Sequence, residues 1–186
     1  TTLFRSDFNG PLSADDGAFA SSSSSYDNYP ASRAIDGDLD TSWFAADNDA
    51  ANLGTTPFVQ VTFPRLATVI QVNIRGNREF GDGYYIFAGR IDLFGEDGSI
   101  LFAQDVKMSG QLWDGDFILP TPQADVRTVR FTSTLDESIE PGLAELEVLG
   151  TFQGPAPSPS EHENLATADG TLAYSSTNYV GYPPSR

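Results

Sequence analysis

"GRIDLFGEDGSILFAQDV", residues 89–106, consists of two apolar segments of strand length on either side of a tight turn. Asp97-Gly98 lies between them, and Asp-Gly is typical of the two-residue turns that join antiparallel strands, because those turns need a positive φ. Apolar residues at helical spacing are hard to find here or elsewhere in the chain. The stretch therefore predicts an antiparallel β-hairpin.

Other segments of strand length lie between turns rich in Gly, Pro, Asn and Asp. "PFVQVTF" (57–63) alternates apolar and polar residues, and "TVIQVNIRG" (68–76) does so with one extra residue. Three more such segments are residues 115–120, 126–133 and 143–150. Roughly six to eight short strands with turn-rich connections predict an all-β fold, either an antiparallel β-sandwich or a related barrel.

The charge of the chain excludes several kinds of partner. Its 186 residues include 26 acidic and 10 basic ones, a net charge of -16. This balance argues against nucleic acid, which requires a basic surface, and against anionic membrane surfaces. It fits an extracellular protein, a salt-tolerant protein or one whose carboxylates bind cations. The chain has no cysteine, so a bound metal is one alternative to disulfides for stabilising an extracellular domain.

The chain is expected to be a piece of a longer secreted or surface protein. We find no signal peptide and no apolar run of transmembrane length, so no membrane insertion is expected. "GPAPSPSE" (154–161) is typical of an extended linker. The expected organisation is a lead-in over 1–11, a β-sandwich domain over 12–153, a linker over 154–163 and a further segment over 164–186.

That last segment contains a repeat of the beginning of the domain. Residues 169–186 align without a gap with residues 16–33, and ten of the eighteen positions are identical. We interpret residues 164–186 as the truncated start of a second copy. A neighbouring repeat in the parent chain is therefore an expected partner.

"AIDGDLDTSW" (34–43) concentrates oxygen-bearing side chains beside apolar residues. Asp36, Asp38, Asp40 and Thr41 lie within six residues, and Gly37 permits a sharp turn between them. Ca²⁺ takes six to eight oxygen ligands, and a distant carboxylate such as Glu145 could complete such a shell. A cluster of solvated acids in Asx turns remains the alternative on composition alone.

Three motifs in order resemble a known family. They are "ASRAIDGDLDTSW" (31–43), "PFVQVTF" (57–63) and "GLAELEVLG" (142–150). The stretch over 12–150 resembles the discoidin family, also called coagulation factor V/VIII type C, which includes carbohydrate-binding module family 32. The resemblance implies a jelly-roll β-sandwich of the galactose-binding-like type.

The resemblance also implies a structural Ca²⁺ site in the loop within residues 34–43. Many bacterial members of the family hold Ca²⁺ there through carbonyl, carboxylate and hydroxyl oxygens. Asp40 is not among the implied ligands and is expected to be a solvated acid, while Trp43 is expected in the core. Carried over one position at a time, the implied ligands are Arg33, Asp36, Asp38, Thr41, Ala144 and Glu145.

For ligand binding, the resemblance points to the loops at one end of the sandwich. The sugar-binding branch uses an Arg after the central strand, polar loop residues and an aromatic ring. In "NIRGNREFGDGYYIFAGR" (73–90), Arg78 is the best match for that Arg and Arg75 is the alternative. The further candidates are Asn77 and Glu79 as polar partners beside Phe80, and Tyr84, Tyr85 and Trp113 as rings.

Alternatives apply to the rings and to the loops around them. Tyr84 and Tyr85 could instead belong to a strand that enters the core, and Trp113 in "GQLWDGD" (110–116) could fold back on the core. A second loop rich in acidic residues, "DESIEPG" (136–142), is a third candidate wall of the site. If the domain binds a glycan, Arg78 and at least one of these rings should converge on one exposed concavity.

The expected function is that of a calcium-stabilised, non-catalytic carbohydrate-binding module. The chain has no phosphate loop, nucleophile elbow or Cys/His pair, so no enzyme activity is expected. The only histidine, His162, lies in the linker. The chain therefore lacks the loop His that the sugar-binding branch often uses, and galactose specificity does not follow from the resemblance. The alternative function is a structural repeat without a sugar site, acting as a spacer or in cell adhesion.

Overall fold

The computed structural model describes residues 11–14, 17–81 and 83–154. The chain divides into two units, Thr1–Gln153 and Gly154–Arg186, and only the first is described here. The expected lead-in apart from Pro11, the linker apart from Gly154 and the repeated segment at the C-terminus lie outside the described residues. They stay predictions.

The described residues form short 3-10 helices and seven strands. No helix in this part of the chain is long and apolar enough to cross a membrane. In chain order the elements are η1 (Leu12–Ala14), β1 (Phe19–Ser22), η2 (Ala31–Ile35), β2 (Trp43–Phe44), η3 (Ala51–Leu53), β3 (Phe58–Gly76), β4 (Ile86–Phe94), β5 (Ile100–Lys107), β6 (Gly115–Asp136) and β7 (Gly142–Phe152).

The predicted hairpin over residues 89–106 is confirmed as β4 and β5. The two strands pair antiparallel, with Leu93 opposite Phe102. The Gly95 N–H donates to the Ser99 carbonyl at 2.9 Å, which closes the turn. Gly98 has a φ of 79°, the positive value that the Asp-Gly signal predicted.

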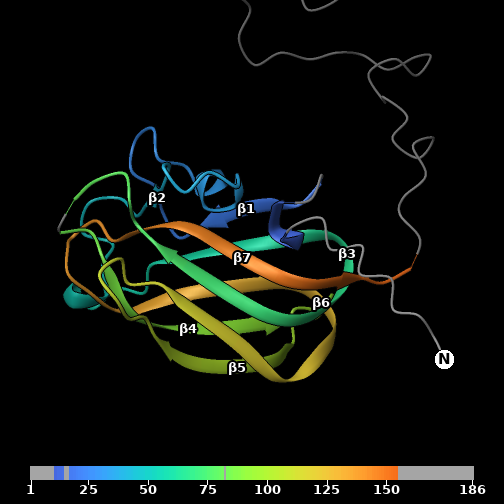
Figure 1. Cartoon of the computed structure of the whole chain (residues 1–186). Helices are drawn as coiled ribbons and strands as arrows, with labels where there is room; N and C mark the ends of the chain where they lie inside the picture. The colour runs from blue at the N-terminus through green and yellow to red at the C-terminus, as the bar shows by residue number, and fades with distance from the viewer. Residues whose placement is uncertain (1–10, 15–16, 82, 155–186) are drawn as a thin grey trace, which may run out of the picture. The chain divides into compact units, whose positions relative to one another are not determined.

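Every strand pair in the described residues is antiparallel, which confirms the predicted all-β class. The strand order is β2-β7-β3-β6-β4-β5, and β1 pairs with β3 beside this path. Strand β3 is therefore central, with β7, β6 and β1 as its neighbours (Figure 1). Strand β7 brings Glu145 opposite Arg75 of β3.

Strands β3 and β6 are longer than the sequence predicted, because each joins two expected strands. The pairing of β3 with β6 shifts register between Thr62 and Ala67 and again between Val69 and Gln71. Pro64 falls in the first of these irregular stretches. Proline lacks an N–H for the ladder and interrupts pairing, which is why the sequence suggests a strand end there. The strands instead continue through the irregularity and bend.

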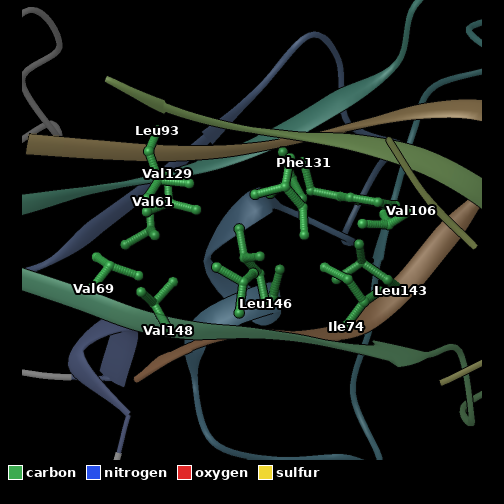
Figure 2. Close-up of a cluster of buried hydrophobic side chains, with 14 of the residues drawn as sticks. Val61, Val69, Ile74, Leu93, Val106, Val129, Phe131, Leu143, Leu146 and Val148 are labelled. Atoms are coloured by element: carbon green, nitrogen blue, oxygen red, sulfur yellow. The ribbon is translucent and has the colours of Figure 1, made fainter. Parts of the chain in front are cut away.

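The bends let one strand contribute to both layers of the sandwich. Figure 2 shows Val61 in one layer with Val129 and Phe131, and Val69 in the opposite layer with Val148. Strand β3 therefore crosses between the layers at its irregular middle. The layers enclose a core in which Trp43 is fully buried, as the resemblance implied.

Candidate ligand and metal sites

An open hollow of about 140 Å³ lies among loops of the domain, and we call it the aromatic hollow. Five of its six lining side chains are rings, and the sixth is a carboxyl. They come from four segments that are distant in sequence. The lining residues are Tyr26, Tyr29, Phe44, Phe80, Tyr84 and Glu140.

Main-chain hydrogen bonds place these segments beside one another. The Tyr26 N–H donates to the Phe44 carbonyl at 2.9 Å, and the Tyr29 N–H donates to the Tyr26 carbonyl at 3.0 Å. The Gly142 N–H donates to the Tyr84 carbonyl at 3.0 Å. A Cβ at Gly142 would overlap the Phe44 ring, so the close approach of β7 to this ring requires glycine. These contacts therefore fix the backbone segments from which the rings project.

The rings of the aromatic hollow pack edge to face. The centroids of Tyr29 and Phe44 are 5.2 Å apart at 87°, and those of Phe44 and Tyr84 are 5.5 Å apart at 78°. Phe80 lies 5.6 Å from Phe44. Although the rings contact one another, Tyr26 remains 40% exposed and Phe80 41% exposed. Large rings held rigidly at the surface offer apolar area for a ligand at little loss of side-chain entropy.

Asn77, one of the candidate ligand residues, is fully buried and supports the loop that carries Phe80. Its Nδ2 donates to the Phe80 carbonyl at 2.8 Å. Its Oδ1 accepts from the N–H groups of Glu79 and Phe80 at 3.0 and 3.2 Å. Asn77 is thus placed to position Phe80, and its amide is occupied by protein partners.

Glu79, a second candidate, links this loop to η2 and to the acidic loop. Both of its carboxylate oxygens accept from Arg33 Nη1 at 3.1 Å. One of them also accepts from the Ser42 N–H at 3.0 Å. The Arg33 guanidinium lies 4.8 Å from the centroid of Tyr29. Glu79 therefore helps to place a ring of the aromatic hollow through Arg33.

Arg78 and Arg75 do not line the aromatic hollow. Arg78 Nη2 pairs with Asp114 at 2.7 Å, and its Nη1 donates to the Gly76 carbonyl at 2.8 Å. Arg75 pairs with Asp116 at 2.7 Å and with Glu147 at 2.9 Å, across the strands that flank β3. The expected convergence of Arg78 with a ring on this concavity is not observed. Of the candidate rings, Tyr84 lines it.

Neither Trp113 nor Tyr85 lines the hollow as a surface on which a sugar could stack. The Trp113 ring is half-buried and lies 4.4 Å from the Phe87 ring, packed against the core. Its backbone φ of 53° is in the left-handed region, which turns the chain back at this point. Tyr85 is buried. The structure thus favours the alternative in which these two rings belong to the packing of the domain.

Carboxyl groups surround the Tyr26 side of the aromatic hollow. Asp47 and Glu140, and more weakly Asp27, raise the pKa of the Tyr26 phenol, since a phenolate would lie among negative charges. The neighbouring Asp47 carboxyl, together with partial burial, raises the pKa of Glu140. This edge of the hollow is therefore negative.

The acidic loop, residues 36–41, closes on itself through its own oxygens. Asp36 accepts from the Asp38 N–H at 2.9 Å and from the Thr41 hydroxyl at 2.8 Å. The Thr41 hydroxyl also lies 3.2 Å from the Asp38 carbonyl. Gly37 has a φ of 79°, so the turn requires a residue that tolerates the left-handed region. Three of the implied calcium ligands thus converge within one loop.

Glu145 joins this loop to β7. It is only 3% exposed, and its Oε1 accepts from the Gly37 N–H at 2.7 Å. Burial, with a further contribution from the Asp36 carboxyl, raises the pKa of Glu145 to about 8. Two carboxyls in contact at a partly buried position, beside hydroxyl and carbonyl oxygens, form a donor set that suits Ca²⁺.

The remaining implied ligands lie on adjoining elements. Arg33 is in η2, which packs against β7, and Ala144 precedes Glu145 in β7. Among the described residues, no group of three or more His, Cys, Asp or Glu side chains is placed to hold a metal. A cation in the acidic loop would therefore depend on the two carboxylates together with main-chain carbonyls and the Thr41 hydroxyl.

The family model of the F5/8 type C domain matches residues 18–140. This match covers most of the sandwich, including the acidic loop and all six lining residues of the hollow. The chain belongs to the F5/8 type C domain family. Comparison of its sequence with curated proteins gave no match.

Solved structures similar to this F5/8 type C domain include carbohydrate-binding modules. The family 32 module of C. perfringens NanJ, in complex with galactose, has 20% identity and a TM-score of 0.62, covering 74% of this chain and 95% of that one. A Streptococcus pneumoniae fucose binding module has 18% identity and a TM-score of 0.60, with coverage of 78% and 99%. Chitosan-binding module 1 of a Paenibacillus sp. IK-5 chitosanase/glucanase has 22% identity and a TM-score of 0.58, with coverage of 75% and 98%. These likenesses establish the galactose-binding-like fold.

Four residues that line the hollow of this F5/8 type C domain were not among the candidates, and Phe80 was named only as a neighbour of the candidate residues. They are Tyr26, Tyr29, Phe44 and Glu140. Both tyrosines stand at identical positions of the internal repeat, opposite Tyr179 and Tyr182, which was a usable signal. Glu140 belongs to the loop over 136–142 that was expected to form a wall. Phe44 follows the core Trp43 and carried no separate signal.

Proposed function

We propose that this domain is a glycan-binding module and that its ligand occupies the aromatic hollow. The observation that carries the proposal is the exposure of Tyr26 and Phe80 within a group of five rings that pack against one another. Soluble domains bury most large rings, and an exposed group with a nearby polar residue is typical of a binding site. Ring faces pack against the C–H surfaces of sugars.

The size of the hollow limits what it can enclose. Pockets that enclose drug-sized ligands measure roughly 300–1,000 Å³, whereas this open hollow measures about 140 Å³. We therefore propose that it receives a single sugar unit, such as the end of a chain. A contact of this size gives weak affinity per site, and tandem copies in a parent protein would increase avidity.

Similar structures support the ligand class without identifying the sugar. They are a module in complex with galactose, a fucose binding module and a chitosan-binding module, so one fold serves chemically different carbohydrates. We propose a non-catalytic role, because the hollow offers rings and one carboxyl side chain. A secreted or surface location fits both this role and the acidic composition.

We further propose that Ca²⁺ stabilises the module. Asp36, Thr41 and Glu145 would hold it through side chains, and Arg33, Asp38, Thr41 and Ala144 through carbonyls. When bound, the ion supplies positive charge between the two carboxyls. Glu145 would then be ionised, and the acidic loop would be linked to β7. The link also braces η2, whose Arg33 contacts Tyr29 of the hollow.

A glycan array with and without EDTA tests the proposal, using wild-type protein, Phe80→Ala and the control Phe19→Ala. Phe19 is 57% exposed on β1 and does not line the hollow. We expect sugar binding by the wild type and by Phe19→Ala, and loss of most binding in Phe80→Ala. If the folded wild type retains no sugar, the spacer or adhesive alternative is favoured.

A further inference from the structure

Two carboxyl groups are held together at the edge of the aromatic hollow. Glu140 lines the hollow, and the Asp47 carboxyl lies near enough to raise the pKa of Glu140. The loops that carry them are joined by main-chain bonds, from the Ala45 N–H to the Pro141 carbonyl at 2.9 Å and from the Asn48 N–H to the Ile139 carbonyl at 3.0 Å. The backbone therefore keeps the two acids close.

These acids have no basic partner within the described part of the chain. No Lys or Arg there forms an ion pair with Asp27, Asp47 or Glu140. Arg33 contacts a ring of the hollow, but both oxygens of Glu79 already accept from it. When both are ionised, two carboxylates held this close repel each other, and a cation placed beside them relieves that repulsion.

The rings of the hollow favour the same kind of ligand group. The face of an aromatic ring carries partial negative charge, so it attracts a cation within about 6 Å of its centroid. Tyr26 and Tyr84 therefore act in the same direction as the two carboxyls, whereas the Tyr29 ring already holds the Arg33 guanidinium, 4.8 Å from its centroid. Tyr26 is itself surrounded by Asp47, Glu140 and Asp27.

We infer that the aromatic hollow selects glycans that carry an ammonium group, as amino sugars do, over neutral glycans and rejects carboxylate-bearing ones. This inference rests on the proposed function. The sugar ring stacks on exposed rings such as Phe80, and its ammonium group pairs with Glu140 and Asp47. N-acetylation removes the positive charge and leaves only the stacking. A sialic acid or uronic acid brings a third carboxylate to this edge.

Calorimetric titration at low ionic strength, at a pH where the amine is protonated, tests the selection. The probes are a glucosamine trimer, the N-acetylglucosamine trimer and sialyllactose. Wild-type protein is expected to bind the glucosamine trimer at least fivefold more tightly than the acetylated trimer and to bind sialyllactose most weakly. Salt should reduce the preference, because exposed charges are screened.

Glu140→Gln and Glu137→Gln form a matched pair, since both remove one negative charge from the same loop. Glu137 is exposed and does not line the hollow. The preference for glucosamine should fall below twofold in Glu140→Gln and persist in Glu137→Gln. Equal affinity for the two trimers, or a preference unchanged by Glu140→Gln, would overturn the inference and leave glycan binding intact.

Failure of the proposed function has a different result. In that case none of the three oligosaccharides binds the folded wild type. Tetramethylammonium chloride, followed by NMR of the tyrosine ring signals, then tests the hollow without a sugar. Shifts of the Tyr26 and Tyr84 signals that disappear in Glu140→Gln would support cation selection by the hollow. Unshifted signals would overturn it.

Discussion

The acidic loop and the aromatic hollow both depart from the usual rule that charged side chains are exposed and large rings are buried. Beside the loop, Glu145 is a carboxyl that the fold buries, whereas in the hollow Phe80 is a ring that the fold exposes. Carboxyls are seldom buried without a partner, and large rings are seldom exposed in groups. The loop is closed by its own hydrogen bonds, while the hollow is open. We therefore expect the loop to govern stability and the hollow to govern binding.

The largest expected effect is the removal of calcium. An ion that binds only the folded state adds about 2.7 kcal/mol at a hundredfold excess over its Kd. For a domain of roughly 150–250 residues, 1 kcal/mol corresponds to about 2–4 °C. EDTA should therefore lower the Tm, measured by calorimetry, by roughly 5–10 °C.

Asp36→Asn should reproduce this loss in the presence of calcium, because it removes a ligand charge while retaining an acceptor for the Thr41 hydroxyl. Asp40→Asn is the matched control, since Asp40 is exposed in the same loop and is outside the implied ligand set. Superimposable melting curves with and without EDTA would refute the calcium proposal. An equal loss in both variants would instead indicate a general effect of loop charge.

A second effect concerns pH in the calcium-free protein. The pKa of Glu145 is about 8 in the folded state, against 4.5 ordinarily. Between these values the folded state binds a proton that the unfolded chain has released, so stability falls as pH rises through this window. In EDTA the Tm should therefore be several degrees lower at pH 8.5 than at pH 5.5.

Calcium should reverse this trend, because the bound ion requires Glu145 to be ionised and its stabilising effect therefore grows with pH. Glu145→Gln provides the check, since an amide does not titrate over this range. The variant should lose both the decline in Tm and the response to calcium. A decline of unchanged size in the variant would assign the titration to another group.

A third effect separates the hollow from the loop. Phe80→Ala should weaken glycan binding by about tenfold, because a stacked ring contributes roughly 0.5–1.5 kcal/mol beyond the area it buries. Its Tm should change by no more than a few degrees, since Phe80 is half exposed and the supporting Asn77 remains. Titration and calorimetry on the same samples measure both. A large fall in Tm with unchanged affinity would mean that Phe80 is structural.

The fold was largely predictable from sequence, whereas the hollow was not. The hairpin around Asp97-Gly98 follows from turn chemistry and strand length, which act locally. The continuity of β3 through Pro64 depends on register shifts against β6, which no local pattern encodes. The hollow joins Tyr26, Phe44, Tyr84 and Glu140 through contacts between distant loops, so only its members in recognisable motifs could be anticipated.

The candidate ligand residues illustrate the same limit. Asn77 and Glu79 were singled out for ligand contact because polar residues beside an arginine suit sugar hydroxyls. In the structure their hydrogen-bonding groups are occupied by protein partners that fix Phe80 and Arg33. A sequence pattern identifies which loop matters. It does not distinguish a side chain that faces the ligand from one that holds its neighbour.

The smallest expected effect concerns Arg78, and it decides where the ligand lies. Arg78 pairs with Asp114 and donates to the Gly76 carbonyl, away from the aromatic hollow. If the glycan occupies the hollow, Arg78→Ala should change its affinity by less than twofold. The lost ion pair is partly exposed, so stability should fall by about 0.2–1 kcal/mol. A charge-assisted bond to the ligand would instead contribute about 1.5–3 kcal/mol, a loss of tenfold or more in affinity. Titration of Arg78→Ala beside Phe80→Ala therefore locates the sugar. A tenfold loss of affinity in Arg78→Ala with none in Phe80→Ala would place the site at the loop around Asp114 and not in the aromatic hollow.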